Sequence, residues 1–76
     1  MEWKRTSAKN LKAEFGNQVL IARYELLDTN NVPNGFAFIL QEPDWFWAIH
    51  YIQGNRTTMS KCPNIRDAVR FAKQLP

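Results

Sequence analysis

The chain has 76 residues, which is enough for a single domain spanning residues 1–76. A hydrophobic fraction of 45% and an aromatic fraction of 13% are sufficient for a packed core and exclude intrinsic disorder. The net charge of +3 at pH 7 is common for a globular domain and does not by itself indicate a nucleic-acid partner.

The segment before Gly16 fits two structures. Trp3 is expected on a short strand or over one end of the core. Within residues 7–15, the apolar positions fit a short helix, but "LKAEF" also alternates apolar and polar residues as a strand does. We favour the strand, because the Gly16-Asn17 pair would then join it to the next strand in a tight hairpin.

Four further strands follow in the chain. "QVLIARYELL" and "GFAFILQ" alternate along their length, and the long loop "DTNNVPN" separates them. Residues 44–52 form the third strand, and "RTTMSK" is rich enough in threonine to pair with it as an edge strand. The pairs Asn34-Gly35 and Gly54-Asn55 are expected to supply the positive φ angles of hairpin turns.

The last element changes to a helical period. In "NIRDAVRFAKQL" the apolar residues recur at spacings of three and four, so the sequence predicts an amphipathic helix. Asn64 is the expected N-cap, and Asp67 stands three residues later, where it can reach back as in a capping box. The predicted fold is therefore α+β: an antiparallel meander of four to five strands with one C-terminal helix packed on one face.

Both faces of this sheet are rich in apolar residues, so the helix could cover either. One helix is wide enough to cover two or three strands, and it covers them on one face of the sheet only. The most continuously apolar set is assigned to the helix side: Leu20, Ala22, Tyr24, Leu26, Phe36, Phe38, Trp47, Ile49 and Tyr51. The outer face then carries Ile21, Arg23, Ile39, Gln41, Phe46, Ala48, His50 and Ile52.

The order of these features resembles known small proteins. An early Trp, "LKAEFGN", the Trp-x-Trp strand "WFWAIHY" and "DAVRFAKQL" together resemble the β-meander-plus-helix proteins of phage and mobile-element genomes. The second half is also similar to the arm-type DNA-binding domain of tyrosine integrases. That resemblance implies a sheet that reads DNA bases through polar side chains, but residues 44–52 offer only His50 between their ends.

An apolar outer face indicates a contact surface. We expect a non-enzymatic protein-binding module, either a homodimer or an adaptor or inhibitor of a foreign partner. The expected interface residues are Ile21, Arg23, Ile39, Phe46, His50 and Ile52. The alternative for this face is that the N-terminal segment or the long loop covers it.

Nucleic-acid binding is the second functional hypothesis. Basic residues of the last strand and the helix would meet phosphates in this case: Arg56, Lys61, Arg66, Arg70 and Lys73.

The sequence offers little for other functions. One histidine and one cysteine, His50 and Cys62, cannot supply a metal site or a catalytic set, so we expect no enzyme activity, cofactor, metal or small-molecule substrate. The lone cysteine and the absence of a long apolar run predict a cytoplasmic protein without membrane contact.

Overall fold

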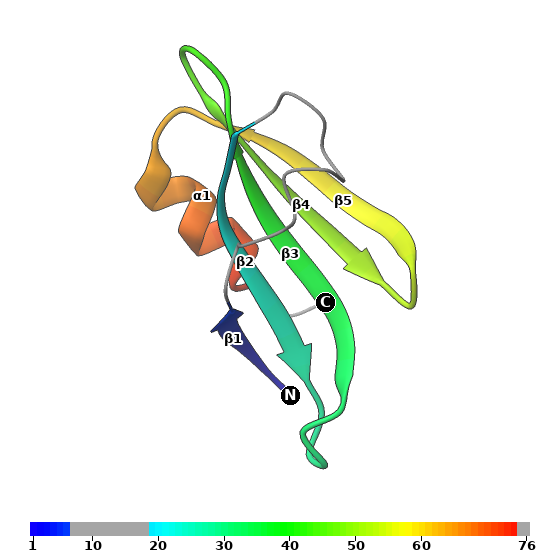
Figure 1. Cartoon of the computed structure of the whole chain (residues 1–76). Helices are drawn as coiled ribbons and strands as arrows, with labels where there is room; N and C mark the ends of the chain where they lie inside the picture. The colour runs from blue at the N-terminus through cyan, green and yellow to red at the C-terminus, as the bar shows by residue number, and fades with distance from the viewer. Residues whose placement is uncertain (7–18, 75–76) are drawn as a thin grey trace.

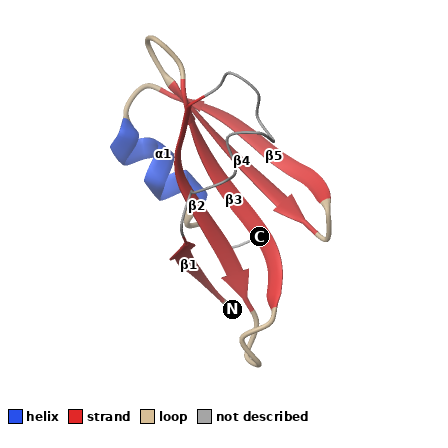
Figure 2. Cartoon of the chain, viewed as in Figure 1, coloured by secondary structure: helices blue, strands red, loops and turns tan. Residues whose placement is uncertain are grey.

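A computed structural model of the chain describes residues 1–6 and 19–74. Within them lie the strands β1 (Glu2–Thr6), β2 (Val19–Leu27), β3 (Pro33–Gln41), β4 (Phe46–Ile52) and β5 (Asn55–Cys62), followed by the helix α1 (Ile65–Ala72). The strands pair antiparallel in chain order, and α1 packs on one face (Figures 1 and 2). The predicted meander with a C-terminal helix is confirmed. The strand expected within residues 7–15 and the turn at Gly16-Asn17 lie outside the described residues.

The β4–β5 hairpin turns one residue earlier than the sequence predicts. Gln53 and Gly54 adopt positive φ angles of 53° and 82°, while Asn55 already pairs with Ile52 as the first residue of β5. Two successive left-handed residues match the right-handed twist of the flanking strands. The prediction of a tight turn here was correct, but its central residues are Gln53-Gly54 and not Gly54-Asn55.

The prediction of a turn at Asn34-Gly35 was wrong. The β2–β3 loop turns earlier, where Asp28 Oδ1 accepts hydrogen bonds from the backbone amides of Asn30 (2.8 Å) and Val32 (3.0 Å). Gly35 instead lies inside β3, paired with Ile52 of β4. A Cβ atom there would come within 2.6 Å of Ile52 Cδ1 and 2.7 Å of the Tyr51 carbonyl oxygen, so this glycine permits close approach between strands.

Gly35→Ala should therefore lower the free energy of unfolding by about 1–3 kcal/mol, the usual range for overpacking. Gly54→Ala is the control, because nothing lies within 4 Å of its Cβ position and only the φ angle of +82° opposes the change. It should cost about 1 kcal/mol. Urea unfolding of both variants measures the difference. A Gly35 variant as stable as the wild type would contradict the close approach of β4.

The helix begins as the sequence predicts. Asn64 has an extended backbone, and its Oδ1 accepts a hydrogen bond of 2.9 Å from the Asp67 amide. The Asp67 carboxylate returns to the Asn64 side-chain amide (3.2 Å), whereas a capping box would return to the backbone. The helix ends at Ala72, and Lys73 is its C-cap, so the helix is shorter than the predicted one, which continued to residue 75.

The helix covers the opposite side of β3 and β4 from the one predicted. Its buried residues Ala68 and Ala72 belong to one core cluster with Ala37 and Ile39 of β3 and Ala48 of β4. The predicted placement of Phe36, Phe38, Trp47, Ile49 and Tyr51 under the helix was therefore wrong, because the register sets them on the other face. In β2 the prediction was correct for Ala22 and Tyr24, which belong to the cluster.

Side-chain size explains which face α1 selects. Ala37, Ala48, Ala68 and Ala72 are all 0% exposed. Alanine on both sides of a contact lets the helix backbone come close to the sheet, as small residues do wherever two elements pack tightly. The larger aromatic side chains would hold the helix further away, and Phe36, Phe38, Trp47 and Tyr51 lie on the other face.

An irregularity in β2 exchanges two more predicted positions. The register shifts between Leu20 and Ala22: Leu20 pairs with Leu40, and Ala22 pairs with Ile39. The extra residue, Ile21, packs against the core cluster under the helix. Leu20 shares the opposite face with Leu40. A bulge inserts one residue and so reverses the alternation on one side of it.

Candidate functional site

The sheet face opposite α1, called here the aromatic face, carries a row of large apolar side chains. Three cross-strand pairs form its centre: Phe36 with Tyr51, Phe38 with Ile49, and Leu40 with Trp47. Phe38, Leu40 and Ile49 are buried, while Phe36, Trp47 and Tyr51 are half-buried. Rings also contact each other, since Phe38 meets Tyr51 edge-on at 5.6 Å between centroids.

The most accessible part of this face lies along β4 and β5. Opposite Trp47, Ile49 and Tyr51 of β4 stand Lys61, Met59 and Arg56 of β5, all three of them exposed. We call this region the aromatic strip and define it by six residues: Trp45, Trp47, Tyr51, Arg56, Met59 and Lys61. It alternates rings with cations across one pair of strands.

Trp45 anchors one end of the aromatic strip. Its ring meets Trp47 edge-on at 6.4 Å between centroids, and Lys61 Nζ lies 4.1 Å from its centroid. Such a cation–π contact holds the lysine over the ring while its ammonium group keeps access to solvent. A shallow depression beside it is lined by Asp44, Trp45, Lys61 and Pro63.

Arg23 extends the same chemistry to the other half of the aromatic face. Its guanidinium carbon lies 4.7 Å from the Phe36 ring centroid, and its Nη1 lies 3.3 Å from Glu25 Oε1. Both side chains are about one-fifth exposed, so this ion pair is only partly screened by solvent. It does offset the charge of Arg23, while Arg56 and Lys61 of β5 remain exposed cations on this face.

The structure corrects the predicted outer surface. Ile39 and His50 are buried on the helix side, and Phe46 and Ile21 pack against the same core cluster. Ile52 lines a pocket beside His50 and is half-buried. Of the six predicted interface residues, Arg23 alone lies on the face away from the helix. The reason is the reversed choice of face on β3 and β4, and for Ile21 it is the irregularity in β2.

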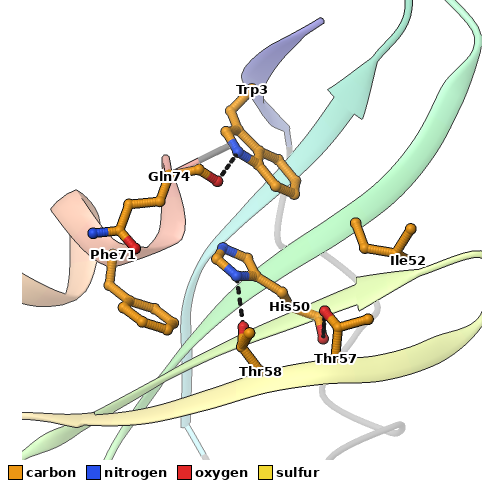
Figure 3. Close-up of a pocket in the computed structure, with 7 residues that line it drawn as sticks. All are labelled: Trp3, His50, Ile52, Thr57, Thr58, Phe71 and Gln74. Carbon is orange, nitrogen blue, oxygen red and sulfur yellow. Dashed lines mark hydrogen bonds between the residues drawn. The ribbon is translucent and has the colours of Figure 1, made fainter. Parts of the chain in front are cut away.

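His50 is a structural residue of the helix contact. Its Nε2 donates to the Ala72 carbonyl oxygen (3.1 Å), because a carbonyl can only accept, and its Nδ1 lies 2.7 Å from Thr58 Oγ1. The ring is stacked between Trp3 and Phe71, at 5.2 and 5.1 Å between centroids (Figure 3). These contacts join β1, β4, β5 and the end of α1. His50 is therefore buried under the helix and does not belong to the outer interface for which the sequence predicted it.

The predicted phosphate-binding residues are divided between two sides of the molecule. Arg66 and Arg70 are exposed on α1. Lys61 and Arg56 pair with Trp47 and Tyr51 and so belong to the aromatic face. Lys73 follows the helix, with Nζ 5.9 Å from the Tyr24 ring centroid. No single flat surface formed by the described residues can use all five.

Residues 1–6 and 19–74 contain no group of three or more His, Cys, Asp or Glu side chains that could hold a metal ion. Cys62 is buried, with its thiol near Ser60. None of the helices described is long and apolar enough to cross a membrane.

Sequence reasoning placed Trp47 and Tyr51 in the core and so missed the aromatic strip. One signal could have revealed it, since Ala22, Ala37 and Ala48 mark the face that a helix bearing Ala68 and Ala72 can approach. Comparison of the chain with protein-family models, with curated proteins and with solved structures gave no match.

Proposed function

We propose that this chain is a non-enzymatic binding module that contacts another protein through the aromatic strip. The main support for this proposal is that the partly accessible Trp45, Trp47 and Tyr51 lie beside the exposed Met59 and Arg56. Aromatic residues, methionine and arginine are the types enriched at protein interfaces, and tryptophan, tyrosine and arginine dominate their binding energy.

Charge favours a foreign partner over a second copy. β5 lies at one edge of the sheet among the described strands, and edge strands pair readily with another chain. If two copies paired along the whole of β5 (Asn55–Cys62), antiparallel register would set Arg56 of each opposite Lys61 of the other. Like charges directly opposite are destabilising. A partner with acidic residues around an apolar patch complements the strip better.

Matched charge reversals test this proposal. Arg56→Glu with Lys61→Glu changes the strip, and Arg66→Glu with Arg70→Glu makes the same change in net charge on exposed positions of α1. The chain is immobilised, and the proteins that it retains are quantified. The amount of a specific partner retained should fall about tenfold or more with the strip variant, because two charge pairs are lost. The helix variant should retain it.

Two outcomes would count against the proposal. Equal loss with both variants would show a response to net charge alone. A wild-type chain whose mass in solution rises to that of a dimer, and falls to a monomer in the strip variant, would replace the foreign partner with a second copy.

Single-stranded nucleic acid is the second candidate. The observation that favours it is the direct cross-strand pairing of rings with cations, Trp47 with Lys61 and Tyr51 with Arg56. Base stacking on aromatic side chains beside phosphate-binding cations is the usual design of single-strand binders. In this candidate function Arg56 and Lys61 bind phosphates, as the sequence predicted, but the basic residues of the helix do not take part.

Salt dependence distinguishes the nucleic-acid surfaces. If Arg56 and Lys61 contact phosphates of a single strand, changing both to glutamine should reduce the log–log salt slope by about 1.4, or about 0.7 for each contact. Changing Arg66 and Arg70 to glutamine tests the predicted helix surface in the same way. Titration of labelled single-stranded DNA, RNA and duplex at two salt concentrations supplies the slopes. Undetectable binding at low salt would exclude both surfaces.

A further inference from the structure

A pocket lies on the helix side of the sheet, away from the aromatic strip. It has a volume of about 340 Å³ and forms where β1, the β4–β5 hairpin and the end of α1 meet. Trp3, Phe71 and Ile52 provide apolar walls, and His50 lies between the two rings (Figure 3). Thr57 and Thr58 stand on the β5 side, and Gln74 follows the end of α1, where its carbonyl oxygen accepts a hydrogen bond of 2.6 Å from Trp3 Nε1. Its walls come from three regions far apart in the sequence.

The size of the pocket limits what it can hold. Small-molecule pockets have volumes of roughly 300–1,000 Å³, so this one is at the lower end. An apolar cavity of about 150 Å³ accommodates benzene. A volume of about 340 Å³ is therefore sufficient for a molecule of two fused rings. Flat rings are also the shape that Trp3 and Phe71 can contact.

The polar groups of the pocket define the functional group of such a ligand. Because Nε2 of His50 donates to Ala72, Nδ1 of the neutral ring accepts from the Thr58 hydroxyl. Thr57 Oγ1 donates to the His50 carbonyl oxygen at 3.4 Å. Both hydroxyl hydrogens are thus used, and the oxygen lone pairs remain available as acceptors. Gln74 adds the acceptor oxygen of its side-chain amide, so a ligand donor is matched from this side as well. The described lining residues carry no formal charge when His50 is neutral, so an ionised ligand would lose hydration without compensation.

We propose that this pocket binds a neutral aromatic molecule of two fused rings that carries one N–H or O–H donor. The rings lie against Trp3, Phe71 and Ile52, and the donor binds the hydroxyl oxygen of Thr57 or Thr58. This site is separate from the proposed protein surface, because the two lie on opposite faces of the sheet. Each can therefore fail without the other.

Indole is a suitable probe, and the full chain is titrated with it while backbone and indole N–H resonances are followed by NMR. Saturable shifts should gather at Trp3, His50, Thr57 and Phe71, with a Kd on the order of 0.1–1 mM for so small a ligand. 1-Methylindole, which lacks the donor, should bind about fivefold to tenfold more weakly.

Two variants test the location. Thr57→Phe places a ring in the pocket from an exposed strand position, where aromatic residues are favourable, and should abolish indole binding. Val19→Phe adds the same ring at an exposed position of β2, opposite Gln41 and outside the pocket, and should leave the Kd unchanged. Spectra of both variants establish that they remain folded.

Other results would overturn the proposal. Shifts confined to the aromatic strip, an unchanged Kd in Thr57→Phe, or no saturation at millimolar indole would exclude the pocket as the site. Equal affinity for indole and 1-methylindole would exclude the threonine contact that defines the ligand class.

Discussion

Replacing His50 with alanine should lower the free energy of unfolding by about 3–4 kcal/mol, within the range for large-to-small changes in a core. The ring is 7% exposed and stacks on both Trp3 and Phe71. Its loss also removes the hydrogen bond of 3.1 Å from His50 Nε2 to the Ala72 carbonyl oxygen at the end of α1. A helix carbonyl that loses its partner without gaining water is costly. Urea unfolding at constant pH measures the change.

His50→Phe separates the two contributions of this residue. Phenylalanine keeps an aromatic ring between Trp3 and Phe71 but makes neither hydrogen bond. We expect it to cost about 1–3 kcal/mol, the penalty for unsatisfied buried partners. Alanine should be clearly worse than phenylalanine, because it also loses the stacking. Equal losses in the two variants would show that the stack contributes nothing to stability.

The elements of the fold follow from local sequence. Alternation located β2 and β3, the threonine-rich stretch located β5, and Asn64 marked the start of α1. These signals are short-range, because a cap or an alternating strand is decided within a few residues. The wrong prediction of a turn at Asn34-Gly35 has a long-range cause. Gly35 is needed because a side chain there would collide with Ile52 on the next strand, and not because the chain turns at this point.

The choice of sheet face could not be settled by apolar content. Both faces of β3 and β4 are apolar, and a count of apolar residues favoured the aromatic face as the one under the helix. Close packing of the helix on the sheet instead required the face that carries the alanines. The bulge at Ile21 then exchanged Leu20 with its neighbour, which no local pattern indicated. Because one residue of shift moves every side chain to the other face, a single error of face misplaced almost the whole predicted interface.

The candidate site was only partly within reach of sequence reasoning. Arg56 and Lys61 were identified as available cations, and the structure adds what stands opposite them, Tyr51 and Trp47. Trp3 was expected near one end of the core, yet its stacking on His50 depends on how β1 pairs with β2. Contacts between residues separated by some 47 positions in the chain are set by topology, which local periodicity does not contain.

Ala68→Leu tests the alanine contact between α1 and the sheet. Ala68 is 0% exposed and belongs to one cluster with Ala37 and Ala48, so three added carbon atoms have no space unless the helix moves away. We expect a loss of about 3 kcal/mol, at the upper end for overpacking. A single core of this size rarely supplies more than about 3–5 kcal/mol, so the variant should keep no more than about 2 kcal/mol and be partly unfolded at 25 °C.

The matched control for this change is Arg70→Leu on the same helix. Arg70 is exposed, so the same new side chain meets solvent there, and stability should change by no more than about 0.5 kcal/mol. Circular dichroism during thermal and urea unfolding compares the two variants. If Ala68→Leu were as stable as the wild type, α1 could not rest on alanines. The helix would then belong on the aromatic face, and Trp47 and Tyr51 would return to the core where the sequence first placed them.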